Sequence, residues 1–312
     1  MKVAAGREFF ERYHDRAHAI VPDLNWALIE PDGSWSEPPG DCDLIVYAGD
    51  AYREQFVEAM IALPHPRWAH TEDAGTDGLF YDAMRAKKVT ITHSPGANAP
   101  EVAEFAIGLV LWSAKRFGTF QRHQDQHRWE WINLESLSDK TLLVVGLGAI
   151  GSLVAAHAKG FQMRVLGIRE SSLKVPKVDR QGSVADLPEF LGLADFVVLA
   201  LPSTPATQGL IGKRELAQMK STATLINVAR GSIVDIQALK EALESGEIHQ
   251  ACLDVISVEP WPKRDPLWDM PNLFLTPHNA WSSPLYLPRV AELWLNNLER
   301  YARGEELLQQ CE

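Results

Sequence analysis

Three polar stretches, each close behind an apolar run that predicts a buried strand, carry residues capable of acid–base chemistry. They place Arg230 in NVARGS, Glu259 near the end of LDVISVEP and His278 in TPHNAW. Because ligands bind beyond the carboxyl ends of strands in open α/β sheets, we expect the three side chains at one sheet edge. Taken alone, each has an ordinary structural explanation: a turn cap, a surface acid or a loop histidine.

Together the three residues form a set that could reduce a 2-keto acid. Arginine fixes a carboxylate and polarises the neighbouring carbonyl through paired hydrogen bonds. Histidine donates a proton near neutral pH, and a carboxylate on its other ring nitrogen would hold it in the protonated form. We favour this interpretation because the residues occur together downstream of a dinucleotide motif.

That motif is TLLVVGLGAIG, residues 141–151, in which a strand predicted at Leu142–Val145 precedes the spacing G-x-G-x-x-G. Gly146 allows a sharp turn, Gly148 lets backbone N–H groups approach a pyrophosphate, and Gly151 lets the next helix pack closely. A helix predicted over Ile150–Gly160 points its positive end at the anion. The alternative is a tight strand–helix turn without a ligand.

The kind of dinucleotide depends on the residues after the second strand, Arg164–Ile168. Folds that bind NAD usually have an acidic residue here, for the ribose hydroxyls. This sequence has Arg169, followed by Glu170 and then Ser171, and an arginine with hydroxyls suits a 2′-phosphate. We therefore expect NADP(H) to be preferred, with NAD(H) possible if Glu170 faces the ribose. Arg169 could also be a solvated surface residue.

From residue 141 onward, apolar runs alternate with helical patterns, which predicts a doubly wound α/β sheet. The strand candidates are Leu142–Val145, Arg164–Ile168, Phe196–Leu201, Thr224–Asn227, Ala251–Val255 and Leu273–Thr276, and the helical candidates include Lys213–Met219 and Asp235–Ser245.

Residues 1–95 have a similar order and predict a smaller parallel sheet. The strand candidates are Trp26–Ile29, Leu44–Ala48, Arg67–Thr71 and Val89–Thr92, and the helical candidates are Arg7–Ala19 and Tyr52–Leu63. After a proline-rich break, a long amphipathic helix predicted over Glu101–Phe120 carries the chain onward. A final helix over Val290–Leu308 returns to the first unit. This predicts one domain from residues 1–95 and 284–312, and another from residues 96–283.

Bulk properties limit the possible partners and compartment. A length of 312 residues favours two domains. A formal net charge of −11 argues against binding to nucleic acid or to an anionic membrane, because both attract positively charged proteins. The three cysteines are far apart and odd in number, which suits a reducing cytoplasm rather than a disulfide framework. His123 and His127 could bind a metal but lack an evident third ligand. We read residues 122–131 as a solvated or subunit-contacting arm and expect no metal.

The sequence also resembles a known family through NVARGSIVD, CLDV followed by VEP, TPHNAW, HSPGANAPEVAEFAIGL, LPSTPATQGLI and HTEDAGTD. These segments are similar to signatures of the D-isomer-specific 2-hydroxyacid dehydrogenases, most of all the glyoxylate/hydroxypyruvate reductase branch. The resemblance is strong over residues 95–283. It implies a Rossmann cofactor domain, a discontinuous flavodoxin-like substrate domain, an active site in the cleft between them, and a homodimer.

The resemblance also implies a role for individual residues. It makes Arg230 the substrate-binding arginine, His278 the acid/base and Glu259 its partner, with Asp254 near the nicotinamide amide. The implied cofactor-binding residues are Gly146, Gly148, Ala149, Ile150, Gly151, Arg169, Ser171, Leu201, Pro202, Thr207, Val228, Ala229 and Asp254. The implied substrate-binding residues are Ala74, Gly75, Thr76, Arg230, His278 and Trp281. From composition alone, the loop DAGTDG at residues 73–78 could equally be a plain turn.

Two other functions compete with a reductase of small keto acids. Some relatives in the family act as co-repressors, so the chain could be a non-catalytic dinucleotide sensor. Such a protein usually has long disordered flanks, which this sequence does not show. An S-adenosyl ligand enzyme on a similar sheet would not need an arginine, glutamate and histidine set.

Overall fold

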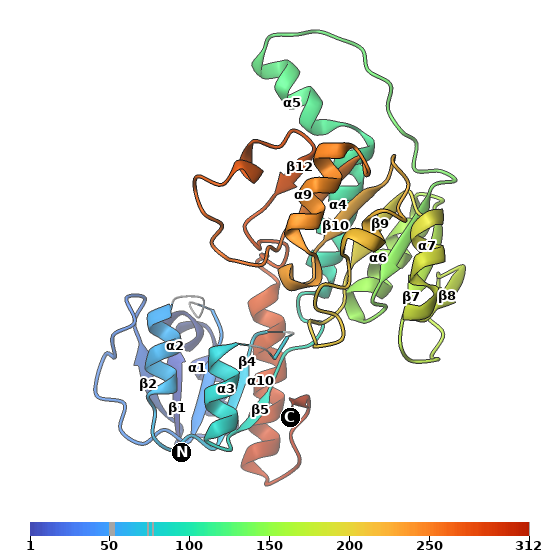
Figure 1. The fold of residues 1–312 in the computed structure, drawn as a ribbon. Helices are drawn as coiled ribbons and strands as arrows, with labels where there is room; N and C mark the ends of the chain where they lie inside the picture. The colour runs from blue at the N-terminus through green and yellow to red at the C-terminus, as the bar shows by residue number, and fades with distance from the viewer. Residues whose placement is uncertain (50–53, 74, 77, 312) are drawn as a thin grey trace. The chain divides into compact units, whose positions relative to one another are not determined.

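The computed structural model describes residues 1–49, 54–73, 75–76 and 78–311. The chain divides into two compact units, one of Met1–Asn98 with Ser283–Glu312 and one of Ala99–Ser282 (Figure 1). Each unit is an α/β structure built on its own mainly parallel sheet, which confirms the predicted fold class. The sequence predicted domain divisions at residues 95–96 and 283–284.

The second unit contains a seven-stranded parallel sheet in the order β12-β11-β10-β9-β6-β7-β8. Its strands are β6 (Thr141–Val145), β7 (Arg164–Ile168), β8 (Arg180–Gly182), β9 (Phe196–Leu199), β10 (Thr224–Asn227), β11 (Gln250–Leu253) and β12 (Leu273–Leu275). The strand order reverses direction between β6 and β9, so this is the point where a doubly wound sheet opens a crevice at its carboxyl edge.

Helices cover both faces of this sheet. They are α4 (Ala99–Ala114), α6 (Ala149–Gly160), α7 (Leu187–Leu193), α8 (Lys213–Leu216) and α9 (Ile236–Ser245). A further helix, α5 (Phe117–Asp125), follows α4 but does not pack on the sheet. Alternate side chains of β6 face opposite ways: Leu143 and Val145 join the core that includes residues of α7, α8 and α9, while Leu142 and Val144 join the core that includes residues of α4 and α6. Burial on both faces explains why the strands are continuously apolar in sequence.

The helix predicted over Glu101–Phe120 is wrong as a single element, because it breaks into α4 and α5. Arg116 between them has the left-handed φ of 50°, which interrupts the helical hydrogen-bond ladder. The buried face of α4 extends as far as Ala114, whereas α5 buries none of its residues. Figure 1 shows α5 and the segment after it extending away from the sheet of their unit.

The first unit holds five parallel strands and one short antiparallel edge strand, in the order β13-β5-β4-β3-β1-β2. They are β1 (Lys2–Gly6), β2 (Asn25–Ile29), β3 (Leu44–Tyr47), β4 (Trp68–Thr71), β5 (Thr90–Thr92) and β13 (Gln310–Cys311). Its helices are α1 (Arg7–Ile20), α2 (Glu54–Ile61), α3 (Leu79–Ala86) and α10 (Tyr286–Ala302). The parallel strands follow the flavodoxin-like order 2-1-3-4-5.

The C-terminal helix α10 packs against α1 within this unit. The rings of Phe9 and Trp294 meet edge to face with centroids 5.2 Å apart, and Arg16 binds the Glu292 carboxylate through two hydrogen bonds of 2.5 and 2.8 Å. The sequence predicted this last helix over Val290–Leu308, and α10 begins and ends several residues before those bounds. Within the described residues, none of the helices is both long enough and apolar enough to cross a membrane.

The glycine turn after β6 generates a paired prediction about stability. A Cβ on Gly151 would lie 1.9 Å from the carbonyl oxygen of Gly146, whereas a Cβ on Gly148 would meet nothing within 4 Å. We expect Gly151→Ala to lower the free energy of unfolding by about 1–3 kcal/mol and Gly148→Ala to change it by less than about 0.5 kcal/mol. Urea unfolding followed by circular dichroism measures both, and equal stabilities would contradict the close packing at Gly151.

Candidate active site

The turn between β6 and α6 has the geometry that the glycine spacing predicted. Gly146 has a φ of +97° and Gly151 lies against its carbonyl, so both positions require glycine. Gly148 precedes the first turn of α6, where Ala149 and Ile150 begin the helix. The open space beside Gly148 and the helix N-terminus beyond it together leave room for an anion such as a pyrophosphate.

Arg169 follows β7 and reaches back to this turn. Its Nη1 atom donates a hydrogen bond of 2.9 Å to the carbonyl oxygen of Leu147, in the middle of the glycine motif. The arginine is therefore not a freely solvated side chain, which was one of the possibilities left open by the sequence. Glu170 and Ser171 after it are exposed.

The other predicted cofactor residues follow β9 and β10, the next strands along the sheet. Leu201 and Pro202 lie in the segment after β9, where the Thr207 hydroxyl donates to the Pro202 carbonyl at 2.8 Å. Val228 and Ala229 lie directly after β10 and are buried. All of these positions belong to the same unit and follow carboxyl ends of its strands.

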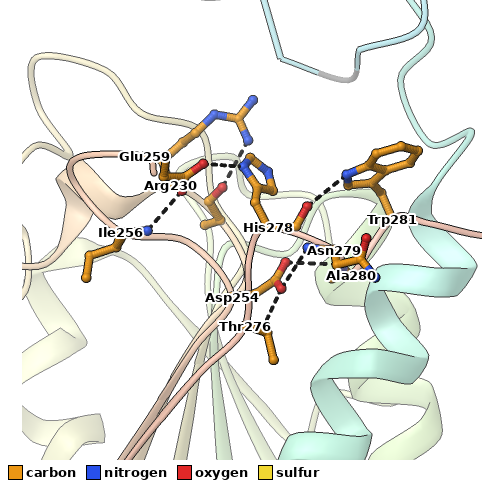
Figure 2. Close-up of polar contacts among 10 residues, drawn as sticks. Arg230, Asp254, Ile256, Glu259, Thr276, His278, Asn279, Ala280 and Trp281 are labelled. Carbon is orange, nitrogen blue, oxygen red and sulfur yellow. Dashed lines mark hydrogen bonds and ion pairs between the residues drawn. The ribbon is translucent and has the colours of Figure 1, made fainter. Parts of the chain in front are cut away.

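The three acid–base candidates come from segments after β10, β11 and β12, which are neighbours in the sheet. Figure 2 shows Arg230, Glu259 and His278 gathered beyond the same end of the strands. The Nδ1 atom of His278 lies 2.9 Å from Oε2 of Glu259, with roughly two-fifths of each side chain exposed. Among the described residues none hydrogen-bonds the Nε2 atom, so this ring nitrogen is left to face a ligand.

The carboxylate of Glu259 is held on both oxygens. Its Oε1 atom accepts the backbone N–H of Ile256 at 3.0 Å, while Oε2 faces His278. Burial alone would raise the pKa of Glu259, but the hydrogen bonds from His278 and Ile256 and the nearby charge of Arg230 outweigh it and hold that pKa below its ordinary value. Glu259 therefore carries its negative charge at neutral pH, next to the imidazole.

Arg230 is fixed by the loop that carries it. The buried amide of Asn227 accepts the Ala229 N–H at 3.0 Å and donates to the Arg230 carbonyl at 2.9 Å. A Cβ on Gly231 would lie 1.9 Å from the carbonyl carbon of Ile256, so the loop after β10 touches the loop that holds Glu259. Arg230 and Glu259 are therefore brought together by backbone contact as well as by charge.

His278 has an unusual backbone, with a φ of 53° in the left-handed region. Such a conformation costs roughly 1–3 kcal/mol for a residue other than glycine and persists only where its surroundings enforce it. Its N–H donates to the Asp254 carbonyl at 2.8 Å, and its own carbonyl accepts the Trp281 indole N–H at 2.9 Å. Trp281, a predicted substrate residue, therefore also supports the histidine.

Asp254 points its carboxylate at the loop around His278. Oδ1 accepts the Thr276 hydroxyl at 2.6 Å and the Asn279 N–H at 2.9 Å, and Oδ2 accepts the Ala280 N–H at 3.0 Å (Figure 2). Only 2% of Asp254 is exposed. Thr276 and Asn227 were not among the predicted site residues; the signal available in the sequence was a polar residue at the end of an apolar run.

The predicted substrate-carboxylate loop belongs to the first unit, after β4. Ala74 lies outside the described residues, while Gly75 and Thr76 are partly exposed. Among the hydrogen bonds of the described residues, none uses the N–H of Gly75 or Thr76, so both remain able to donate to a ligand. The loop is anchored by Tyr81, whose hydroxyl donates to Asp73 at 3.0 Å, and by Arg85, which donates to the Thr76 carbonyl at 3.0 Å.

The sequence is similar to those of proteins from one known family. The family model described as the NAD binding domain of D-isomer specific 2-hydroxyacid dehydrogenases matches residues 107–280, more than half of the chain. A glyoxylate reductase from Korarchaeum cryptofilum is 34% identical over 274 residues, covering 85% of this chain and 81% of that protein. A glyoxylate/hydroxypyruvate reductase B from Cronobacter sakazakii is 35% identical over 266 residues, covering 83% and 80%.

Solved structures extend the similarity to the whole chain. The crystal structure of a D-isomer specific 2-hydroxyacid dehydrogenase from Xanthobacter autotrophicus Py2, in complex with NADPH and MES, superposes with a TM-score of 0.79 at 28% identity. The superposition covers 99% of this chain and 98% of that one. Both units described above therefore have counterparts in a dinucleotide-bound relative.

Proposed function

This chain belongs to the D-isomer-specific 2-hydroxyacid dehydrogenase family, and from that premise we propose that it reduces a small 2-keto acid to the D-2-hydroxy acid. The substrate we propose is similar to glyoxylate or hydroxypyruvate, and the hydride comes from NADPH or NADH. The observation that carries the proposal is the Glu259–His278 pair beside Arg230, in the unit that also contains the glycine turn.

The proposed roles follow from the chemistry of each side chain. Arg230 binds the substrate carboxylate and polarises the keto oxygen. A bound reduced nicotinamide supplies the hydride that reaches the carbonyl carbon. His278 gives the proton on Nε2 to the carbonyl oxygen, which becomes the hydroxyl of the product. Glu259 stabilises the protonated imidazole before transfer and fixes the ring through Nδ1.

We propose that the first unit is the substrate domain and that Ala74, Gly75 and Thr76 receive the substrate carboxylate. The free N–H groups of Gly75 and Thr76 support this role. Trp281 is proposed to line the substrate site. The cofactor is proposed to contact the predicted residues after β6, β7, β9 and β10, with Asp254 near the nicotinamide.

We propose a homodimer in the cytoplasm. The segment from α5 onward exposes 97% of Trp129 and 92% of Trp131. Together with Phe120 and Leu134 these side chains line one apolar hollow that a second copy would cover. The three cysteines carry no disulfide, which suits a reducing compartment. Light scattering during size-exclusion chromatography reports the mass of the assembly in solution.

The activity itself is tested with a panel of 2-keto acids and NADPH, following absorbance at 340 nm, the wavelength at which reduced nicotinamide absorbs. We expect turnover with glyoxylate or hydroxypyruvate, and His278→Asn should lower kcat by about 10²–10⁴-fold because it removes the proton donor. Binding of NADPH, measured by fluorescence, should survive this substitution.

Two results would contradict this assignment. If His278→Asn keeps turnover within a few-fold of wild type, His278 is not the acid. If the wild type oxidises NADPH with none of the keto acids, the proposed reaction is wrong.

The pairing of Glu259 with His278 predicts a pH effect. Glu259→Gln removes the negative charge beside Nδ1 that favours the protonated imidazole. Because reduction needs that proton, the basic limb of the pH–rate profile should move to lower pH. Glu244→Gln on the exposed side of α9 changes the net charge equally and should leave the profile unchanged. An unmoved basic limb with an unchanged rate in Glu259→Gln would refute the pairing.

The cofactor preference rests on Arg169, which lies against the glycine turn where a 2′-phosphate would bring negative charge. We predict a higher kcat/KM for NADPH than for NADH. Charge-assisted hydrogen bonds contribute roughly 1.5–3 kcal/mol, or about 10- to 100-fold. Arg169→Asp should reverse the preference through lost attraction and new repulsion.

Steady-state kinetics with both cofactors at one fixed keto acid measure this preference, and Arg214→Asp on α8 serves as the charge-matched control. Equal efficiency of NADPH and NADH in the wild type would mean that Glu170 or the backbone determines the cofactor instead.

A further inference from the structure

The loop that carries His278 has a support that the acid–base set does not explain. Three donors from Thr276 to Ala280 converge on one buried carboxylate, that of Asp254. Two of them are the successive N–H groups of Asn279 and Ala280, directly after His278. The shortest, at 2.6 Å, is the hydroxyl of Thr276, two residues before it.

These three hydrogen bonds bracket the only residue of the segment 276–280 with a left-handed backbone. Pro277 has no N–H, so the loop before His278 can be tied to Asp254 only through the Thr276 side chain and the His278 N–H. Hydrogen bonds to an ionised carboxylate are among the stronger ones in proteins. They are therefore well suited to hold a conformation that a histidine would otherwise leave.

We propose that Asp254 and Thr276 form a clamp that positions His278, so that Thr276 is a positioning residue for the proton donor. This inference rests on the proposed function for its kinetic consequence, but the clamp itself is a property of the loop. The clamp holds the segments on both sides of His278, and with them the direction in which its ring leaves the backbone. If the backbone relaxes toward an ordinary conformation, Nδ1 moves away from Glu259 and Nε2 moves away from the substrate carbonyl.

The clamp occupies three of about four acceptor positions on the Asp254 carboxylate. One position on Oδ2 remains, so the clamp and a contact to the nicotinamide amide are compatible. A substitution of Asp254 would disturb both roles at once. A substitution of Thr276 tests the clamp alone, because its hydroxyl belongs to the His278 loop and, among the described residues, bonds only Oδ1 of Asp254.

The experiment compares Thr276→Val, which keeps the shape and removes the hydroxyl, with Thr276→Ser, which keeps the hydroxyl. In Thr276→Val we expect kcat for keto-acid reduction to fall about 10- to 100-fold, the size of effect that a misplacement of about 1 Å can have. KM and the Kd for NADPH should stay within about three-fold. Thr276→Ser should restore kcat to within about three-fold of wild type.

A second readout does not depend on turnover. Hydrogen exchange of the Asn279 and Ala280 amides, followed by mass spectrometry or NMR, should be faster in Thr276→Val and close to wild type in Thr276→Ser. Exchange shows whether the clamp exists even if the wild type reduces none of the keto acids. A failure of the proposed function and a failure of the clamp therefore give different results.

Unchanged exchange at Asn279 and Ala280 in Thr276→Val would overturn the clamp. So would a Thr276→Val variant that binds NADPH more weakly but keeps its kcat at saturation, because the hydroxyl would then act through the cofactor. A loss of kcat that Thr276→Ser does not restore would likewise show that the hydrogen bond is not the cause.

Discussion

The arrangement of the site depends on one constraint: three neighbouring parallel strands are paired so that they end at the same height in the sheet. Asn227 at the end of β10 pairs with Leu253 of β11, which in turn pairs with Leu275 of β12. Because these strands end together, the segments that follow them emerge at one edge of the sheet. Arg230, Glu259 and His278 meet there although many residues separate them in the chain. A slip of one residue in this register would move the loops apart and reverse the buried faces of the strands.

Charge and backbone geometry act together at this edge. Glu259 stays ionised because hydrogen bonds and the neighbouring Arg230 outweigh its partial burial. Asp254 is more deeply buried, and its oxygens accept hydrogen bonds from the loop that carries His278. The two carboxylates therefore have separate tasks. One faces the proton-carrying ring and the other holds the backbone beneath it. The overall negative charge of the chain makes such local placement of Arg230 necessary for an anionic substrate.

Much of this could be predicted from the sequence, because alternating apolar runs and the glycine spacing report local structure directly. Features set by tertiary packing could not. The break at Arg116 depends on where the buried face of α4 ends, and the strand β8 is short and polar, without an apolar run. The support of His278 by Asp254 and Thr276 escaped prediction for the same reason. Nothing in the spacing of Thr276 shows that its hydroxyl meets a carboxylate 22 residues earlier.

The central claim is a hydride transfer to the carbonyl carbon of a 2-keto acid, and isotope transfer tests it most directly. The enzyme is incubated with hydroxypyruvate and NADPH that carries deuterium on the transferred position of the nicotinamide C4. Chiral chromatography with mass spectrometry then analyses the product. The account predicts the D-2-hydroxy acid with one deuterium on C2. Oxidation of the cofactor without label in a hydroxy acid, or a labelled product of the L configuration, would contradict it.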